Sequence, residues 1–208
     1  GGASLLGVHL EGPFINPAKR GGIAPDAIYA PSLEKLDRIF DLAGSALSMM
    51  TVAPELDQAP DIIAALAARG IVASIGHTAA TYAETLRGFT DGISHVTHIF
   101  NAMPPLNHRE PGPVGAIIET QDITIQLIGD GVHVHESVVR ILHAAIEPGR
   151  LALITDGVQA MGLPEGRYRY NGREYESKNG AARYLDGTLI GSALSLRDVV
   201  LRYQSFTG

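Results

Sequence analysis

The sequence predicts an α/β protein with a parallel sheet, and three observations carry this prediction. Short apolar runs rich in β-branched residues recur along the 208 residues. Helix-like segments separate most of these runs, as in proteins whose buried parallel strands are joined by crossover helices. Hydrophobic residues make up 45% of the chain and charged residues only 18%, which is enough apolar material for a substantial core.

The strands and helices can be assigned in order from these patterns. The expected strands are Leu5–Leu10, Ala46–Val52, Ile71–Ile75, Ile93–Ile99, Ile123–Ile128 and Leu151–Ile154. The expected helices are Pro31–Ala43, Asp61–Arg69, Tyr82–Phe89, Ser137–Ala145 and Leu194–Tyr203. In the first helix Leu33, Leu36 and Phe40 share one face, and Gly70 follows the second helix at the position where glycine commonly ends a helix.

Residues 167–189 have a different pattern from the rest of the chain. This stretch is rich in tyrosine, alternates polar with apolar residues, and contains the dipeptides Asn171-Gly172, Asn179-Gly180 and Asp186-Gly187. Such dipeptides favour tight hairpin turns. We therefore expect a hairpin-like insertion near 167–189 within a single domain that covers residues 1–208.

Composition excludes several classes of function. With 16 Lys and Arg against 22 Asp and Glu the formal net charge is −6, so the chain lacks the general attraction for polyanions that nucleic-acid binding needs. The absence of cysteine excludes thiolate zinc sites and thiol nucleophiles, which leaves histidine and carboxylates as metal ligands. No apolar run approaches the roughly 20 residues of a membrane span. We expect a cytoplasmic protein with neither nucleic-acid nor membrane partners.

Polar residues follow nearly every expected strand, which favours one sheet architecture over another. Examples are Glu11 after the first strand, His77 after the third and Asp156 after the sixth. A (β/α)8 barrel gathers the carboxyl ends of all its strands into one site, whereas an open doubly wound sheet offers a single crevice. Periodicity alone is compatible with both, but the positions of the polar residues favour a TIM-type barrel.

Three of these residues form a candidate metal site. Glu11, His77 and His98 supply a carboxylate and two imidazoles, which are the three protein ligands of an open catalytic zinc site. The alternative for each histidine is a structural role. His95 is expected to point away from His98 and to serve packing or the surface, whereas His9 shares the face of Glu11 and can support it.

Asp156, Arg109 and His133 are further candidates. A carboxylate at the end of a buried strand is costly unless it is paired or near a metal, so Asp156 is a candidate general base for water activation. Its alternative role is a helix cap or a turn. Arg109, in the proline-rich loop 101–112, is a candidate anion clamp that His133 can assist, although a solvated surface charge and a helix cap are their alternatives.

Seven motifs carry a resemblance to a known family. They are His9-Leu10-Glu11-Gly12-Pro13-Phe14, Gly76-His77-Thr78-Ala79-Ala80-Thr81, Thr97-His98-Ile99-Phe100-Asn101-Ala102-Met103, Arg109-Glu110-Pro111-Gly112, Asp130-Gly131-Val132-His133, Thr155-Asp156-Gly157 and Gly187-Thr188-Leu189-Ile190-Gly191-Ser192. In this order, and along nearly the whole chain, they resemble the N-acetylglucosamine-6-phosphate deacetylases of the amidohydrolase superfamily.

The resemblance implies an activity and a set of site residues. Glu11, His77 and His98 would hold a divalent metal, with zinc expected before Fe, Co or Mn, and Asp156 would be the catalytic acid/base residue. The implied substrate contacts are Gly22, Ile23, Asn101, Ala102, Arg109, His133, Leu189, Ile190, Gly191 and Ser192, with Arg109 and His133 on the phosphate. The reaction would release acetate and glucosamine 6-phosphate, in amino-sugar catabolism and cell-wall sugar recycling, and the full-length form would be a homodimer.

Two departures from the family pattern leave alternatives open. Family members usually carry Gly-Ala-His or Gly-Thr-His where this chain has Gly21-Gly22-Ile23. Because the side chain of Ile23 cannot form a hydrogen bond, either the affinity for substrate is lowered or the preferred sugar differs. The alternative to N-acetylglucosamine 6-phosphate is therefore a related amidohydrolase with a different N-acyl sugar substrate.

The second departure is length. A full barrel takes about 250 residues, and the family adds a small β domain. We expect this chain to be a partial barrel that holds about strands 3 to 8, without the first two strands and the β domain. A non-catalytic sugar-phosphate-binding fragment is then a further alternative.

Overall fold

The structure is a computed structural model that describes residues 4–208. The chain divides into two compact units. The first comprises the chain up to Arg20 together with Pro25–Thr97 and Ala102–Ile123. The second comprises Gly21–Ala24, His98–Asn101 and Thr124–Gly208.

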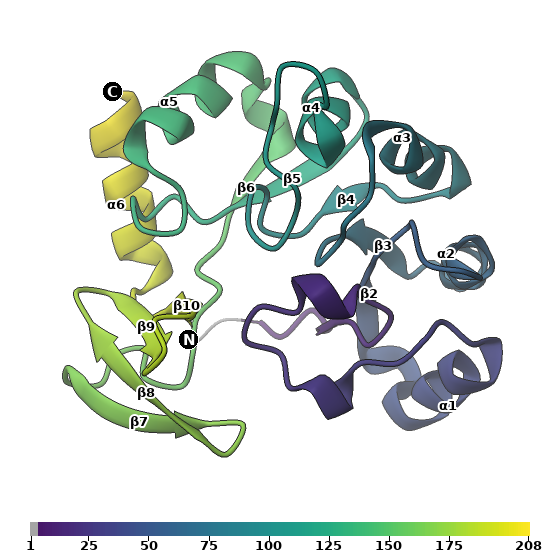
Figure 1. The fold of residues 1–208 in the computed structure, drawn as a ribbon, viewed down its shortest axis with the longest axis horizontal. Helices are drawn as coiled ribbons and strands as arrows, with labels where there is room; N and C mark the ends of the chain where they lie inside the picture. The colour runs from purple at the N-terminus through teal and green to yellow at the C-terminus, as the bar shows by residue number, and fades with distance from the viewer. Residues whose placement is uncertain (1–3) are drawn as a thin grey trace. The chain divides into compact units, whose positions relative to one another are not determined.

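The first unit is built from alternating parallel strands and helices (Figure 1). Its strands are β1 (Val8–Glu11), β2 (Leu47–Val52), β3 (Val72–Ile75) and β4 (His95–Val96). Its helices are α1 (Leu33–Ala43), α2 (Ala59–Ala68), α3 (Tyr82–Asp91) and α4 (Gly112–Glu119). Each strand pairs in parallel with the next along the chain, with Glu11 opposite Thr51 and Ser74 opposite His95.

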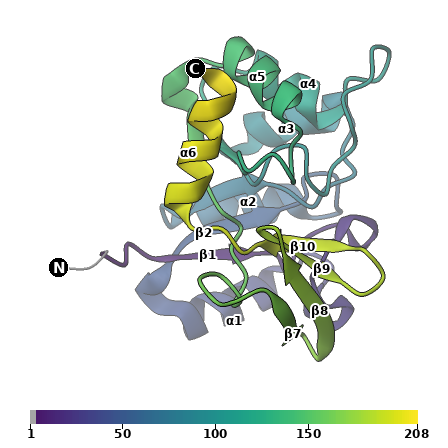
Figure 2. The ribbon, with the colours of Figure 1, turned by 90° about the vertical axis from the view of Figure 1, so that its left-hand side faces the viewer.

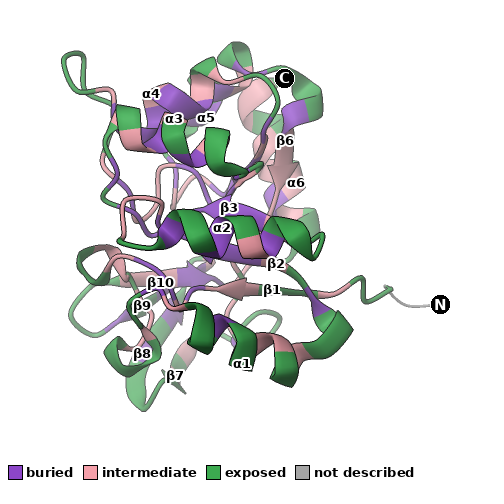
Figure 3. Ribbon diagram, turned by 90° about the vertical axis from the view of Figure 1, so that its right-hand side faces the viewer, coloured by how far each residue is buried: buried purple, intermediate pink, exposed green. Residues whose placement is uncertain are grey.

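The core of the first unit lies between the strands and their helices. Met50 and Val52 on β2 and Ile75 on β3 are fully buried, as expected for strands covered on both faces. Ile62, Ile63 and Leu66 on α2 are buried as well. Figure 3 shows β2 and β3 largely buried, with the exposed faces of α1 and α2 turned outward.

The starts of two helices in the first unit follow capping rules that the sequence supplies. The Ser32 hydroxyl accepts a hydrogen bond from the backbone N–H of Lys35 at the start of α1. Thr81 with Glu84 forms a reciprocal capping box at the start of α3.

Short 3-10 helices lie at Pro17–Lys19, Pro25–Ala27, Gly44–Ala46 and Pro148–Arg150.

The second unit combines a parallel strand pair with an antiparallel sheet. The parallel strands are β5 (Thr124–Leu127) and β6 (Leu151–Leu153), and the helices are α5 (Glu136–Ala145) and α6 (Leu196–Thr207). The two helices lie side by side (Figure 2). A 2.6 Å hydrogen bond between the side chains of His143 and Tyr203 joins them.

The antiparallel sheet occupies the stretch in which the sequence places turn dipeptides. Its strands β7 (Gly166–Tyr170), β8 (Arg173–Lys178), β9 (Ala181–Tyr184) and β10 (Leu189–Ser192) have the order β10-β9-β8-β7. Asn171 and Asn179 lie between strands with φ values of 48° and 53°, the left-handed conformation that such turns require. Tyr175 and Tyr184 pack with Ala160 and Ala182 in a small separate core.

Within residues 4–208, the parallel strands follow the order β1-β2-β3-β4-β5-β6. A doubly wound sheet reverses its strand order at a switch point, whereas a (β/α) barrel adds each new strand beside the previous one. The expected α/β class and the partial barrel are therefore confirmed.

Among the described helices, none combines the length and the apolar character that crossing a membrane would require.

Several element boundaries differ from the sequence prediction, and one helix was missed. The first strand begins at Val8 instead of Leu5, and β4 ends at Val96 instead of continuing to Ile99. Helix α4 was not predicted, because the prolines before it made residues 101–112 resemble one long loop. Pro113 stands in the first turn of α4, where its missing N–H costs no helical hydrogen bond.

Candidate active site

Glu11 and His77 form a close pair at neighbouring strand ends. Glu11 is the last residue of β1, and His77 follows β3 by two residues. The His77 Nε2 and Glu11 Oε1 atoms lie 2.8 Å apart. His77 Nδ1 lies 2.7 Å from the carbonyl oxygen of Lys19, and because a carbonyl can only accept, Nδ1 donates that hydrogen bond. The ring is therefore oriented with Nε2 toward Glu11, as metal-ligating histidines commonly are.

His98 completes a set of potential metal ligands. It is 3% exposed and lies two residues after β4. Ligand atoms of Glu11, His77 and His98 all lie within 4.8 Å of one another. Two imidazoles and one carboxylate at this spacing fit a divalent ion such as zinc, with a coordination position left for water or substrate.

Several of the predicted site residues have a backbone conformation that is unusual for residues other than glycine. The φ values are 46° at His77, 31° at His98, 51° at Ala102 and 49° at Asp156. Such left-handed conformations cost roughly 1–3 kcal/mol each and cluster at functional sites, where the surrounding structure holds them in place.

A chain of polar side chains lies on the strands of the first unit. His9 Nε2 is 2.8 Å from the Thr51 hydroxyl, which lies 2.8 Å from that of Thr97. Ser74 joins the same Thr97 hydroxyl at 2.7 Å. His9 therefore forms this hydrogen bond with Thr51, a residue of the neighbouring strand β2.

The prediction for His95 depended on strand alternation continuing as far as His98. Because β4 ends at Val96, the alternation rule does not relate these two histidines. Burial lowers the pKa of the half-buried His95 side chain, and the charge of His9 lowers it further. The charge on His9 therefore acts directly on His95.

Asp156 lies half-buried after β6, and its backbone is held by β10. The N–H of Ser192 donates a 2.8 Å hydrogen bond to the Asp156 carbonyl, and the N–H of Val158 donates one of 2.9 Å to the Ser192 carbonyl. A Cβ atom on Gly191 would lie only 2.5 Å from the Asp156 carbonyl oxygen. The glycine in the predicted Leu189–Ser192 segment therefore permits this close approach.

Replacing Gly191 by alanine is expected to displace Asp156 and lower both stability and turnover. The new methyl group meets backbone, which cannot rotate away, at a φ of 144°. Gly187→Ala is the matched control, because Gly187 also has a positive φ of 91° but a Cβ there meets nothing within 4 Å. We expect Gly191→Ala to lower the melting temperature and kcat more than the control does. Equal effects would contradict this role of Gly191.

Two other predicted substrate residues are brought together although they lie far apart in the sequence. A Cβ atom on Gly22 would be 2.9 Å from Ile190 Cγ2, so this part of the chain lies directly against β10. The Tyr184 hydroxyl donates a 3.3 Å hydrogen bond to the Gly22 carbonyl. Ile23, the departure from the family pattern, is half-buried beside this contact.

Asn101 and Ala102 shape the loop that follows His98. The Asn101 side-chain amide donates to the carbonyls of His98 and Ile99 at 3.3 and 3.2 Å, so the side chain turns back on its own loop. The N–H of Thr78 donates a 3.1 Å hydrogen bond to the Ala102 carbonyl. This bond links the loop after β4 to the loop that carries His77.

His133 is held by a buried carboxylate in the loop after β5. Its Nδ1 donates a 2.7 Å hydrogen bond to Asp130 Oδ2, and the two side chains are 3% and 0% exposed. Burial alone would raise the pKa of Asp130, but the bonds and charge of His133 and the N–H of Val132 together lower it. His133 Nε2 is buried and has no hydrogen-bond partner among the described residues. This atom is available to a ligand.

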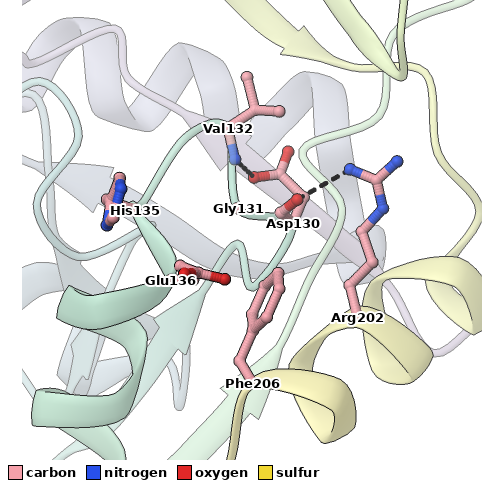
Figure 4. A pocket seen from close by; sticks show the side chains of 7 residues that line it. All are labelled: Asp130, Gly131, Val132, His135, Glu136, Arg202 and Phe206. Atoms are coloured by element: carbon pink, nitrogen blue, oxygen red, sulfur yellow. Dashed lines mark hydrogen bonds between the residues drawn. The ribbon is translucent and has the colours of Figure 1, made fainter.

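Helix α6 supports the loop that carries Asp130. Figure 4 shows Asp130 with Arg202, whose guanidinium donates a 2.9 Å hydrogen bond to the Asp130 carbonyl. The Phe206 ring would lie 2.9 Å from a Cβ on Gly131, so it packs directly against this turn. These residues line a pocket together with Val132, His135 and Glu136.

Arg109 lies exposed in the loop before α4, where its N–H donates to the side chain of Asn107. No hydrogen bond or ion pair within residues 4–208 joins the Arg109 side chain to His133. The joint contact of Arg109 and His133 with a phosphate group stays a prediction.

Sequence reasoning missed Glu55, which follows β2 and accepts hydrogen bonds from residues near His77. The signal was present, because Glu55 is a polar residue shortly after a buried strand, like the residues that were selected.

No family model matches the chain. Individual proteins do match it over almost its whole length. It is 39% identical over 207 residues to the N-acetylglucosamine-6-phosphate deacetylase of Bacillus subtilis (strain 168), a match that covers 99% of this chain and 52% of the relative. It is 35% identical to the N-acetylgalactosamine-6-phosphate deacetylase of Escherichia coli O157:H7, over 100% of this chain and 55% of the relative.

A solved structure agrees with these relatives. A mutant N-acetyl-D-glucosamine-6-phosphate deacetylase from Mycobacterium smegmatis, in complex with N-acetyl-D-glucosamine-6-phosphate, is 36% identical with a TM-score of 0.93. The match covers 97% of this chain and 53% of that chain. The chain spans about half the length of the relatives it matches.

The fold, the ligand cluster and these relatives confirm the resemblance to the amidohydrolase superfamily. Several further relatives and solved structures that match the chain are also N-acetylglucosamine-6-phosphate deacetylases.

Proposed function

We propose that the protein hydrolyses the acetamide group of N-acetylglucosamine 6-phosphate in a metal-dependent reaction, releasing acetate and glucosamine 6-phosphate. One observation carries the proposal. Glu11, His77 and His98 present ligand atoms within 4.8 Å of one another, at strand ends of a fold shared with deacetylases of this substrate. The carboxyl ends of the strands are where barrel enzymes place their chemistry.

The proposed cofactor is zinc, held by Glu11, His77 and His98. This donor set also suits Fe, Co and Mn. When bound, such an ion lowers the pKa of water and polarises a carbonyl oxygen. The carbonyl of Lys19 holds the His77 ring in the orientation that turns Nε2 toward Glu11, where both side chains would bind the ion.

Asp156 is proposed to move the proton. Its carboxylate takes a proton from the attacking water as the new C–O bond forms, and returns it to the nitrogen as the C–N bond breaks. The backbone bond from Ser192 holds Asp156 in place during both steps. His133 offers its buried Nε2 to the substrate, and Arg109 offers a guanidinium suited to a phosphate.

Acetate release from N-acetylglucosamine 6-phosphate by the purified protein tests this proposal, with metal content measured on the same sample. N-acetylglucosamine without the phosphate is the control. We expect turnover of the phosphate ester with about one zinc ion per chain, as an open three-ligand site requires. Bound metal without turnover of any N-acetyl sugar phosphate would contradict the deacetylase activity, and absence of bound metal would contradict the site itself.

A second candidate substrate is N-acetylgalactosamine 6-phosphate. It is favoured by Ile23, which stands where the family usually has histidine, and by the E. coli relative that is named for this sugar. The two sugars differ at a single hydroxyl group. A comparison of kcat/KM for both esters decides between the two substrates.

Ile23→His is expected to lower the KM for N-acetylglucosamine 6-phosphate about 2- to 13-fold, the effect of one added hydrogen bond of about 0.5–1.5 kcal/mol. Ile23→Leu is the control, because it keeps the site apolar and should leave KM nearly unchanged. An unchanged or higher KM in the histidine variant would show that Ile23 does not limit the affinity for this sugar.

The homodimeric state and the cytoplasmic location stay predictions from the sequence.

A further inference from the structure

We infer that Glu55 is a positioning residue for the proposed metal ligands Glu11 and His77. It holds together the loop that follows Glu11 and the loop that contains His77. The inference rests on the proposed metal site. It gives a supporting role to a carboxylate that is not itself a metal ligand. The first observation is where Glu55 lies. It follows β2 by three residues, so it stands at the same end of the sheet as Glu11 on β1 and His77 after β3.

The Glu55 carboxylate accepts three hydrogen bonds from the two neighbouring loops. Oε1 accepts from the Asn16 side-chain amide at 3.0 Å and from the N–H of Ala79 at 2.6 Å. Oε2 accepts from the hydroxyl of Thr78 at 2.5 Å. Asn16 belongs to the loop after β1, whereas Thr78 and Ala79 directly follow His77. One side chain from the loop after β2 therefore links the loops on either side of it.

The hydrogen bonds to the Glu55 carboxylate are strong enough to fix the positions of the two loops. Hydrogen bonds to an ionised carboxylate are roughly twice as strong as bonds between neutral groups. Thr78 is fully buried, so water competes little for its hydroxyl. The ligand cluster consists of Glu11, His77 and His98 and does not include Glu55, whose oxygens accept hydrogen bonds from the loops instead.

The same two loops are joined directly around the His77 ring. The N–H of Asn16 donates a 2.9 Å hydrogen bond to the His77 carbonyl, and the Lys19 carbonyl accepts from His77 Nδ1. Glu55 thus holds in place both the backbone that carries His77 and the loop that orients its ring. Loss of the carboxylate leaves the ligands present but less well aligned. The expected consequence is weaker metal binding with an unchanged chemical step.

The test measures zinc binding directly. The dissociation constant of zinc is determined by competition with a chromophoric chelator for the wild type, Glu55→Ala, Glu55→Gln and Thr78→Val. Asp57→Ala is the matched control, because it removes an exposed carboxylate two residues further along the same loop. The melting temperature of the metal-free protein is measured for each variant. kcat and KM are measured at saturating zinc.

Glu55→Ala is expected to raise the zinc dissociation constant about 10- to 100-fold, the range found for partners that support metal ligands. Glu55→Gln and Thr78→Val should each raise it less, because part of the network remains, and Asp57→Ala should leave it unchanged. Saturating zinc should restore kcat without a change in KM. If Glu55→Ala does not fold, the glutamine and valine variants decide the question.

The outcomes separate this inference from the proposed function. A wild-type protein that binds no zinc would overturn the metal site and the role of Glu55 together. Tight zinc binding by the wild type and an unchanged dissociation constant in the Glu55 variants would overturn only the role of Glu55. A kcat that stays low at saturating zinc would also overturn it, because the effect would then lie in the reaction and not in ligand alignment.

Discussion

Asp156→Asn is expected to leave zinc bound while lowering kcat by about 10²- to 10⁴-fold, the usual contribution of a general acid–base residue. The asparagine amide keeps the size of the side chain but cannot accept and return a proton. The bond from the Ser192 N–H goes to the backbone carbonyl of residue 156, so the substitution does not remove this anchor. Acetate release and metal content, measured on the same preparation, check both halves of the prediction.

Asp122→Asn is the control for that substitution, since Asp122 is exposed just before β5. It should retain wild-type turnover. If Asp156→Asn also retained turnover, Asp156 could not be the residue that moves the proton. If it lost the metal as well as the activity, Asp156 would contribute to holding the ion.

Glu11→Ala is expected to abolish stoichiometric zinc binding and, with it, turnover. Glu11 is the only carboxylate in the ligand cluster and lies 2.8 Å from His77 Nε2, so its removal takes away the anionic ligand and the partner of a buried imidazole. The loss of affinity should exceed the roughly 10- to 100-fold effect of supporting residues. Metal analysis after dialysis, with circular dichroism to verify folding, measures this effect.

Glu34→Ala supplies the matched control, because Glu34 is an exposed carboxylate in the first turn of α1. It should bind one zinc ion as the wild type does. A Glu11→Ala protein that still holds one tightly bound zinc ion would remove Glu11 from the ligand set. The proposal of an open site with three protein ligands would then be wrong.

The alternation of strands and helices could be predicted from local sequence. Strands buried on both faces appear as continuous apolar runs, so Ala46–Val52 and Ile123–Ile128 each match a strand within one residue. Capping residues such as Thr81 mark helix starts for an equally local reason. The start of β1 was wrong because it depends on pairing with β2, which is distant in the sequence. Helix α4 was missed for a local reason, since the prolines before it resemble a loop.

The candidate site could be predicted only as a set of residue types after strands. The rule that reactive residues follow barrel strands selected Glu11, His77 and His98, because polar residues are conspicuous after apolar runs. Their roles as ligands came from the family resemblance. Distances between them depend on which strands are neighbours, and strand pairing joins residues that are far apart in sequence.

The sequence by itself therefore determined the α/β class, the succession of strands and helices along the chain and the residues capable of chemistry, because each depends on residue type and local periodicity. Only the tertiary structure decided how these residues are held. The left-handed backbone at His77, His98 and Asp156, the close approach at Gly191 and the three donors around Glu55 all come from contacts between distant segments. Such contacts leave no periodic trace in the sequence, since a hydrogen bond between two loops requires only a donor and an acceptor that folding brings together.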